Sequence, residues 1–213
     1  MKISKFGHCC LLVEQKSLRL LTDPGIFSTG QDSIQNIDVI LITHEHADHC
    51  HIDSIKNILK NNPIAKIFAN KSVGALLEKE NLTFFVFENG QKYFEKDVSI
   101  EACGNEHAII HPDLPTVQNT GFLIDDKLFY PGDSFTKPPK EIEILALPVA
   151  GPWMKISEAI DYAKIIKPRV WFPMHDGILK YTEVGSRWPS FFLEKIGIKT
   201  LILEIEKETE INF

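Results

Sequence analysis

The chain has 213 residues, 44% of them apolar, which is enough for one α/β domain with a substantial buried core. Its 23 Lys and Arg against 29 Asp and Glu give a net charge of −6 without a long basic run, which argues against a protein that binds nucleic acid in bulk. No apolar run reaches the roughly 18 residues of a membrane helix, and no signal peptide is recognisable, so we expect a cytoplasmic protein that does not insert into a membrane.

The first third of the chain is rich in residues that favour strands. Short apolar runs predict strands over residues 2–6, 9–15 and 18–23. The sequence Asp23-Pro24-Gly25 then interrupts the pattern, and the polar stretch over residues 28–36 is typical of a surface loop. The run DVILIT at residues 38–43 brings the chain back into the core as a buried strand.

Helices and strands alternate along the rest of the chain. Ile52, Ile55 and Ile58 recur at helical spacing and predict a helix over residues 52–61. Ser157 is the expected N-cap of a later helix. Further helices are expected over residues 71–80, 157–166 and 187–196. Further strands are expected over residues 65–69, 84–87, 92–103, 121–125, 127–132, 144–149, 169–174 and 200–205. Because no linker rich in Pro, Gly or Ser divides the chain, we predict a single domain over residues 1–213.

The most informative segment is THEHADHCH, residues 43–51, directly after the DVILIT strand. It places four side chains that can bind divalent metal ions at the spacing H-x-H-x-D-H, namely His44, His46, Asp48 and His49. Residues two apart on a strand face the same side, so His44 and His46 can reach one ion. After the chain turns, Asp48 and His49 can face a second ion. The segment therefore predicts a metal-dependent hydrolase.

Three more candidates lie where a predicted strand gives way to a loop. His107 follows the strand-like run SIEACG, Asp133 follows LFYPG, and His175 follows RVWFPM. Strand-end loops on a packed scaffold are where functional sites are usually built. We therefore expect these residues to complete the ligand set.

Together the motifs resemble those of the metallo-β-lactamase superfamily, and most closely its small stand-alone bacterial hydrolases, which include L-ascorbate-6-phosphate lactonase. The resemblance covers nearly the whole chain, because eight segments occur in the family's order: GHCCLLVE, LLTDPG, HEHADH, NEHAIIHP, NTGFLI, YPGDSF, PVAGPWMKISEAIDYAKIIKP and PMHDG. HEHADH is the most specific of them. The resemblance implies an αββα sandwich of the α/β type, in which two mixed β-sheets are flanked by helices.

The resemblance also implies two divalent metal ions, with Zn²⁺ as the first expectation and Mn²⁺ or Fe²⁺ as alternatives. The implied ligands are His44, His46 and His107 for the first ion, Asp48, His49 and His175 for the second, and Asp133 as a bridge. The diiron oxygen reductases of the superfamily carry Glu at the position of His46. The histidine found here therefore favours hydrolysis over redox chemistry.

Two such ions share a water, lower its pKa towards neutrality and stabilise the charge that develops on a substrate oxygen. We therefore expect a bridging hydroxide that cleaves an ester-type bond of a small molecule, a lactone or a phosphodiester. Asp48 could orient this water or take its proton. His111, four residues after His107, is a candidate proton donor, and its alternative is a role in loop structure.

Other residues are expected around the site. His8 and Asp23 match family positions close to it, where they could hydrogen-bond the ligands or simply form turns. Trp153 could form a wall of the pocket or cover the core.

The cysteines form no Cys-x-x-Cys pair, and we expect buried free thiols, as in a reducing compartment, for Cys9, Cys10, Cys50 and Cys103. Cys50 and Cys103 lie near ligand candidates in the sequence. We do not expect them to bind metal, since zinc thiolate sites usually show paired spacing.

Two other functions compete with the hydrolase. A nuclease of the same superfamily would need an added domain or a basic face, for which the length and the net charge leave no room. A non-catalytic metal-binding protein would keep the site only for folding, and the complete set of seven ligands argues against it. We expect a small-molecule substrate, and the 14 Phe residues and apolar strand faces are compatible with a homo-oligomer.

Overall fold

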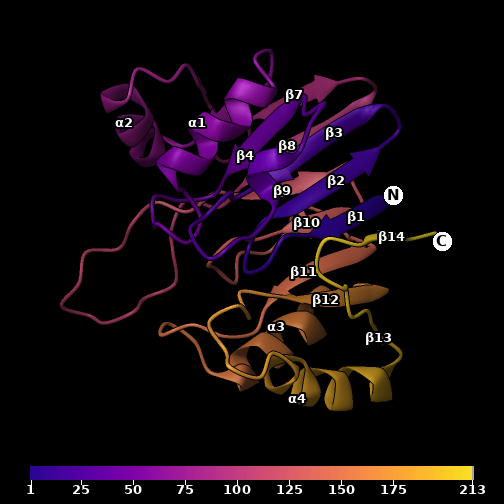
Figure 1. The fold of residues 1–213 in the computed structure, drawn as a ribbon. Helices are drawn as coiled ribbons and strands as arrows, with labels where there is room; N and C mark the ends of the chain where they lie inside the picture. Colours follow the sequence, from indigo (N-terminus) through magenta and orange to yellow (C-terminus); the bar gives the residue numbers. More distant parts are fainter. Residues whose placement is uncertain (213) are drawn as a thin grey trace.

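Two seven-stranded β-sheets pack against each other, and a pair of helices covers the outer face of each (Figure 1). The computed structural model describes residues 1–212. The first sheet has the strand order β14-β1-β2-β3-β4-β5-β6, and the second has the order β13-β12-β11-β10-β9-β8-β7. This architecture confirms the predicted αββα sandwich.

The elements follow one another with short connections. The first part of the chain contains β1 (Lys2–Lys5), β2 (Leu11–Gln15), β3 (Leu18–Thr22), the 3₁₀ helix η1 (Gln31–Ser33), β4 (Val39–Ile42), α1 (Ile52–Asn61), β5 (Lys66–Ala69), α2 (Lys71–Lys79) and β6 (Phe85–Val86). The remainder contains β7 (Lys92–Glu95), β8 (Val98–Cys103), β9 (Gly121–Ile124), β10 (Leu128–Tyr130), β11 (Ile144–Pro148), α3 (Ile156–Ile166), β12 (Val170–Met174), α4 (Glu183–Leu193), the 3₁₀ helix η2 (Glu194–Ile196), β13 (Lys199–Thr200) and β14 (Glu208–Glu210).

Both sheets are mixed in the same way. In the first sheet, β14, β1, β2 and β3 pair antiparallel, and β3, β4, β5 and β6 pair parallel. In the second, β7, β8, β9 and β10 pair antiparallel, and β10, β11, β12 and β13 pair parallel. Each sheet therefore has a set of parallel strands whose carboxyl ends can carry a site.

The side chains of strand β4 contribute to two hydrophobic cores. Val39 and Leu41 lie in the core between the sheets, whereas Ile40 and Ile42 pack with α1 and α2. Successive strand side chains point to opposite faces, and here both faces are covered, so the strand is apolar at every position. The same alternation on β12 places Phe172 between the sheets and Trp171 against α3 and α4.

Two helix predictions need correction. The helix over residues 52–61 is confirmed with the same limits. The predicted N-cap at Ser157 is wrong, because α3 begins one residue earlier and Lys155 occupies the N-cap position. The Glu158 carboxylate accepts a hydrogen bond from the Lys155 backbone N–H at 2.6 Å, which satisfies the helix start without a serine. The last helix begins at Glu183 rather than near residue 187.

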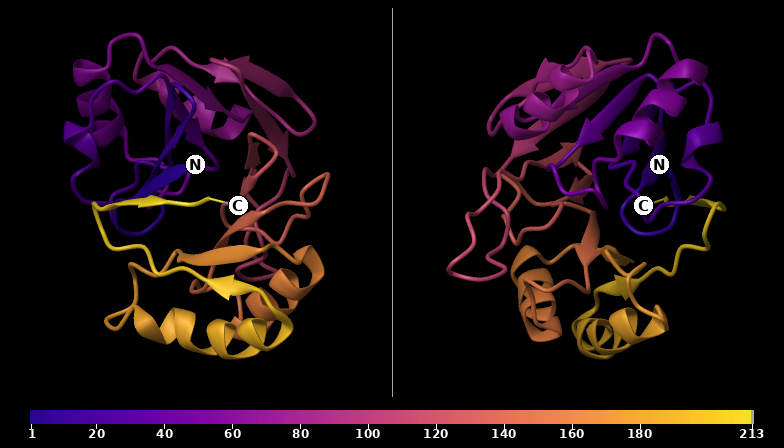
Figure 2. Two further views of the ribbon diagram at one scale, coloured as in Figure 1. Left: turned by 90° about the vertical axis from the view of Figure 1, so that its right-hand side faces the viewer. Right: turned by 60° about the vertical axis from the view of Figure 1, so that its left-hand side comes forward.

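The predicted closing strand over residues 200–205 is also wrong. Of that range only Thr200 belongs to a strand, β13, which pairs with β12. The chain then leaves the second sheet, crosses to the first and pairs as β14 with β1 (Figure 2). Leu203 is buried between the sheets, and Ile202 is exposed. The apolar alternation that suggested a strand therefore belongs to a crossing segment. Within residues 1–212, no helix is long and apolar enough to cross a membrane.

Candidate metal centre

The predicted ligands lie at strand ends of both sheets. The segment after β4 carries His44, His46, Asp48 and His49, and the loops after β8, β10 and β12 carry His107, Asp133 and His175. The first segment turns sharply, because the backbone N–H groups of His49 and Cys50 both donate to the His46 carbonyl, at 2.9 and 2.8 Å. The structure brings all seven residues into one cluster.

One group within the cluster contains three histidines. The ligand atoms of His44, His46 and His107 all lie within 4.8 Å of one another. His44 Nε2 is 3.0 Å from His46 Nδ1. His44 is fully buried and His46 half-buried, so this group opens towards solvent on the side of His46.

A second group surrounds the carboxylate of Asp48. Its Oδ2 lies 3.4 Å from His175 Nε2 and 3.9 Å from His49 Nε2. Both histidines are buried, so the charge of Asp48 is compensated largely within the protein.

Asp133 lies between the two groups. Its Oδ1 is 3.2 Å from His49 Nε2, and its Oδ2 is 2.9 Å from His175 Nε2. The same Oδ2 lies 3.4 Å from His107 Nε2 and 4.0 Å from His44 Nε2, which belong to the first group. A carboxylate that bridges two metal ions would have to lie in such a position, between the two groups.

Several buried atoms at the centre have no hydrogen-bond partner. They are His107 Nε2, Asp133 Oδ1 and both ring nitrogens of His175. The contact of His175 with Asp133 is short, but it is not aligned as a hydrogen bond. Buried polar atoms are normally satisfied, and nitrogen and oxygen atoms that converge at these distances without shared hydrogens suit divalent cations. The donor set therefore fits metal ions.

Asp23 holds one histidine in the orientation that metal binding needs. Its Oδ2 accepts a hydrogen bond from His49 Nδ1 at 2.7 Å, which leaves His49 Nε2 facing the cluster. The fully buried carboxylate also accepts hydrogen bonds from the Thr43 backbone N–H (2.8 Å), the Thr43 hydroxyl (2.7 Å) and the Tyr130 hydroxyl (2.8 Å).

Three further contacts orient the cluster. His107 Nδ1 donates to the Ala108 carbonyl at 2.5 Å, so its Nε2 faces inwards. His8 Nδ1 accepts from the Gly177 backbone N–H at 3.1 Å, which leaves its Nε2–H to donate to Asp48 Oδ2 at 3.3 Å. The indole N–H of Trp153 donates to Asp133 Oδ2 at 2.9 Å.

The electrostatics of the cluster follow from burial and from these contacts. Burial holds the pKa of His44 well below its usual range, which favours the neutral form that binds metal. Burial also lowers the pKa of His49, but the neighbouring Cys9, Asp133 and Asp23 outweigh it and hold that pKa well above its usual range. Burial opposes the charged form of Asp48, yet the close approach of the His175 ring and the hydrogen bond from His8 hold its pKa well below the ordinary value.

A cavity of about 200 Å³ opens directly beside His46 and His107. Its other walls come from the loop between β8 and β9 and consist of Ala108, Ile109, Ile110, Leu114, Pro115, Thr116 and Val117. Among the described residues that line it, none is a Lys or an Arg. The cavity next to the first histidine group is therefore apolar.

The structure does not bring His111 into the cluster. The residue lies on the same loop, its side chain is 62% exposed, and its Nδ1 accepts a hydrogen bond from the Asp113 backbone N–H.

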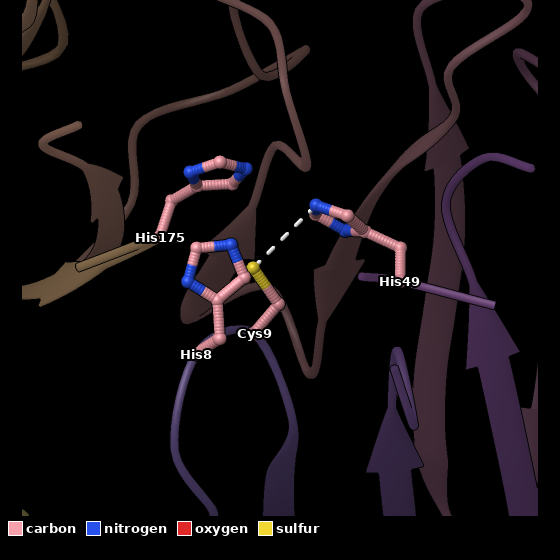
Figure 3. A group of neighbouring side chains, drawn as sticks. All are labelled: His8, Cys9, His49 and His175. Carbon is pink, nitrogen blue, oxygen red and sulfur yellow. Dashed lines mark hydrogen bonds between the residues drawn. The ribbon is translucent and has the colours of Figure 1, made fainter. Parts of the chain in front are cut away.

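Two features of the site were missed from the sequence. Cys9 lies beside His49, with 3.5 Å between Sγ and Nε2 (Figure 3). Its position next to His8 in the Gly-His turn was the available signal. The hydrogen bond of Trp153 to Asp133 was also missed, since Trp153 was expected only as a pocket wall or core cover. All four cysteines are free and buried, as predicted.

Comparison with known proteins agrees with this geometry. The chain is 38% identical to Protein Rv0786c of Mycobacterium tuberculosis over 184 residues, which are 84% of this chain and 85% of that protein. It is 26% identical to the UPF0173 metal-dependent hydrolase Ta0764 of Thermoplasma acidophilum, with 99% of both chains covered. The fold is similar to that of Igni18, a metallo hydrolase from Ignicoccus hospitalis, with a TM-score of 0.79 and 22% identity over 100% of this chain and 98% of that one.

The family whose model matches is described as the beta-lactamase superfamily domain, and the match spans residues 2–175. That range contains strands β1 to β12 and all seven predicted ligands. The chain belongs to the beta-lactamase superfamily and is a metal-dependent hydrolase.

Proposed function

We propose that this protein is a binuclear hydrolase that cleaves the ester-type bond of a small molecule, and that a carboxylic ester or lactone with an apolar part is its substrate. The observation that carries the proposal is the position of Asp133, which contacts both histidine groups and has a buried oxygen without a hydrogen-bond partner. A carboxylate in that position suits two ions rather than one.

In this proposal His44, His46 and His107 would hold one divalent ion, Asp48, His49 and His175 would hold the other, and Asp133 would contribute to both. When bound, the two ions lower the pKa of a shared water and stabilise the negative charge that develops on the substrate. Zn²⁺ suits the histidine-rich set best.

The chain's own groups position the reaction. His8 fixes one oxygen of Asp48, so the second carboxylate oxygen is available to hydrogen-bond and orient the attacking water. The depressed pKa of Asp48 makes it a weak base, which favours orientation over proton removal. His111 stays a candidate proton donor, which would require the exposed loop to move towards the cluster.

The apolar cavity supports the choice of substrate. A phosphodiester carries a negative charge and is usually held by cations in addition to the metal ions. The cavity beside His46 and His107 instead offers Ile110, Leu114 and Val117 to the substrate. An uncharged ester or lactone with an apolar group fits this surface better, and a nucleic acid does not fit it. The buried free thiols support a reducing compartment such as the cytoplasm.

The test combines metal content with a substrate panel. Purified tag-free protein should contain about two metal ions per chain by elemental analysis. It should hydrolyse apolar esters and lactones faster than sugar lactones, and a phenyl phosphodiester most slowly. Metal without turnover of any ester would instead favour a non-catalytic metal-binding protein.

A variant in the cavity separates the substrate proposal from the metal centre. Leu114→Lys should lower kcat/KM for an apolar ester about tenfold, the size expected when one apolar contact is lost, and leave metal content unchanged. Ile64→Lys is the matched control, because Ile64 is 83% exposed and lines a different cavity. An equal response of both variants would count against the cavity as the substrate site.

A further inference from the structure

Cys9 occupies a fixed position beside the second group of ligands. Its backbone carbonyl accepts hydrogen bonds from the Tyr130 hydroxyl at 2.7 Å and the Thr22 hydroxyl at 3.2 Å, so the main chain is held in place. The side chain is buried, and its sulfur points at the ring of His49 (Figure 3). The ligand atoms of Cys9, His8, His49 and His175 all lie within 4.8 Å of one another.

The hydrogen bonds of the three histidines show which of them have a ring nitrogen that is still available to a metal ion. His49 is held at Nδ1 by Asp23, so its Nε2 is available. His175 Nε2 is buried and has no hydrogen-bond partner. His8 is different, because Gly177 and Asp48 engage both of its nitrogens. Cys9 therefore has two neighbours with unengaged ring nitrogens, His49 and His175, whereas His8 is occupied by Gly177 and Asp48.

The distance from the sulfur to His49 suits a shared ion. Zinc bonds of about 2.0–2.3 Å at a tetrahedral angle place a nitrogen and a sulfur ligand of one ion about 3.6 Å apart. Cys9 Sγ and His49 Nε2 are 3.5 Å apart. A weak hydrogen bond between thiol and imidazole is the alternative explanation of this contact.

We propose that Cys9 supplies a thiolate ligand to the second metal position, alongside His49 and His175. This inference rests on the proposed binuclear centre and adds a soft ligand to it. Thiolates select Zn²⁺ or Cd²⁺ over the harder Mn²⁺, so the second position should discriminate among these ions. The thiol proton leaves to solvent when the ion binds.

Cobalt is the direct probe, because a thiolate bound to Co²⁺ gives a near-ultraviolet charge-transfer band that nitrogen and oxygen ligands do not give. Co²⁺-loaded wild-type protein should show the band, and Cys9→Ala should lack it. Cys9→Ala should also weaken Cd²⁺ binding about 10- to 100-fold, with a much smaller change for Mn²⁺. Cys10→Ala is the matched control, because Cys10 is equally buried but packs in the cluster with α1 and α2. It should keep the band.

The outcomes separate this inference from the proposed function. Two bound Co²⁺ ions without the band, in a protein that still hydrolyses esters, would overturn Cys9 ligation and leave the hydrolase intact. No bound metal in any form of the protein would overturn both. If Cys9→Ala does not fold, the alanine variants of Cys10, Cys50 and Cys103 decide the matter. A band that survives in all three supports Cys9, and a band lost in one of them overturns the assignment.

Discussion

Trp153 donates its indole N–H to Asp133 Oδ2 at 2.9 Å, and both side chains are buried. The ring also meets His107 and His175 edge to face, so one tryptophan touches both halves of the candidate centre. Trp153→Phe keeps most of the ring but removes the donor. Metal affinity should fall about 10- to 100-fold, as for other residues that orient ligands, and competition with a chelator measures it. Trp188→Phe, at an exposed position on α4, should change nothing.

Asp133→Asn tests the bridge with almost no change in shape. The amide loses the negative charge, and its NH₂ group would face histidine nitrogens. We expect metal content to fall below two ions per chain and turnover to be lost, because the variant keeps only one of the two oxygens that the ligand groups share. Elemental analysis of the variant and an ester assay give the result, and His46→Ala should behave similarly. Full activity in either variant would refute the ligand assignment.

Asp23→Asn tests the residue that orients His49. The amide cannot accept all four hydrogen bonds that the carboxylate accepts, so we expect the free energy of unfolding to fall by about 3 kcal/mol or more. Metal affinity should fall as well, since His49 is no longer held in one tautomer. Tyr130→Phe removes only one of the bonds to Asp23 and should cost about 1–2 kcal/mol. Denaturant titration compares the two, and equal losses would argue against a special role for the carboxylate.

The metal-free protein should lose stability as the pH rises above about 6.5, the ordinary pKa of histidine. Burial lowers the pKa of His49 and His175, but neighbouring groups outweigh it and raise both values. Their contribution is complete below the unfolded-state pKa and is lost as the pH rises through the folded-state pKa. Burial raises the pKa of Cys9 to about 12, which acts in the same direction at higher pH. Below about pH 6.5 the lowered pKa of His44 has the opposite effect, and its contribution to stability is lost as the pH falls.

Bound metal should weaken this pH dependence, because the ions take the place of the protons on the ligands. The ions also bind more tightly at higher pH, where the ligands are deprotonated. Thermal unfolding at several pH values, with Zn²⁺ or with a chelator, measures both trends. A metal-free protein whose Tm rises steadily from about pH 6.5 to 9 would contradict the pKa directions.

Local signals in the sequence predicted much of the fold. The helix over residues 52–61 was predictable because Ile52, Ile55 and Ile58 share one face, and its observed limits agree. The strand DVILIT was predictable because a short continuous apolar run is typical of a strand buried on both faces, as β4 is. The fate of residues 200–205 was not predictable, because strand pairing there depends on distant parts of the chain. Strand β1 pairs with β14 and not with these residues as a continuous strand. Alternating apolar residues indicate burial but do not name a partner strand.

The candidate site shows the same division. The spacing of His44, His46, Asp48 and His49 is local, and it placed these residues correctly at the end of β4. The contacts of Cys9 and Tyr130 arise only when the two sheets pack, since Tyr130 belongs to the second sheet and reaches Asp23 and Cys9 in the first. No spacing rule describes such contacts. The remaining candidates, His107, Asp133 and His175, were recognisable because each lies in a loop that follows a predicted strand.

The division of the ligands between the two sheets has a consequence for biosynthesis. The segment after β4 leaves the ribosome early with four of the seven candidate ligands, but neither group is complete until the second sheet supplies His107 and His175. Domains of this size fold as units once most of the chain has emerged. Nascent chains should therefore hold metal poorly, and metal acquisition should follow sheet docking. An ion that joins residues from both sheets would then bind late in folding, and its loss would loosen the contact between the sheets at the edge where these strands end.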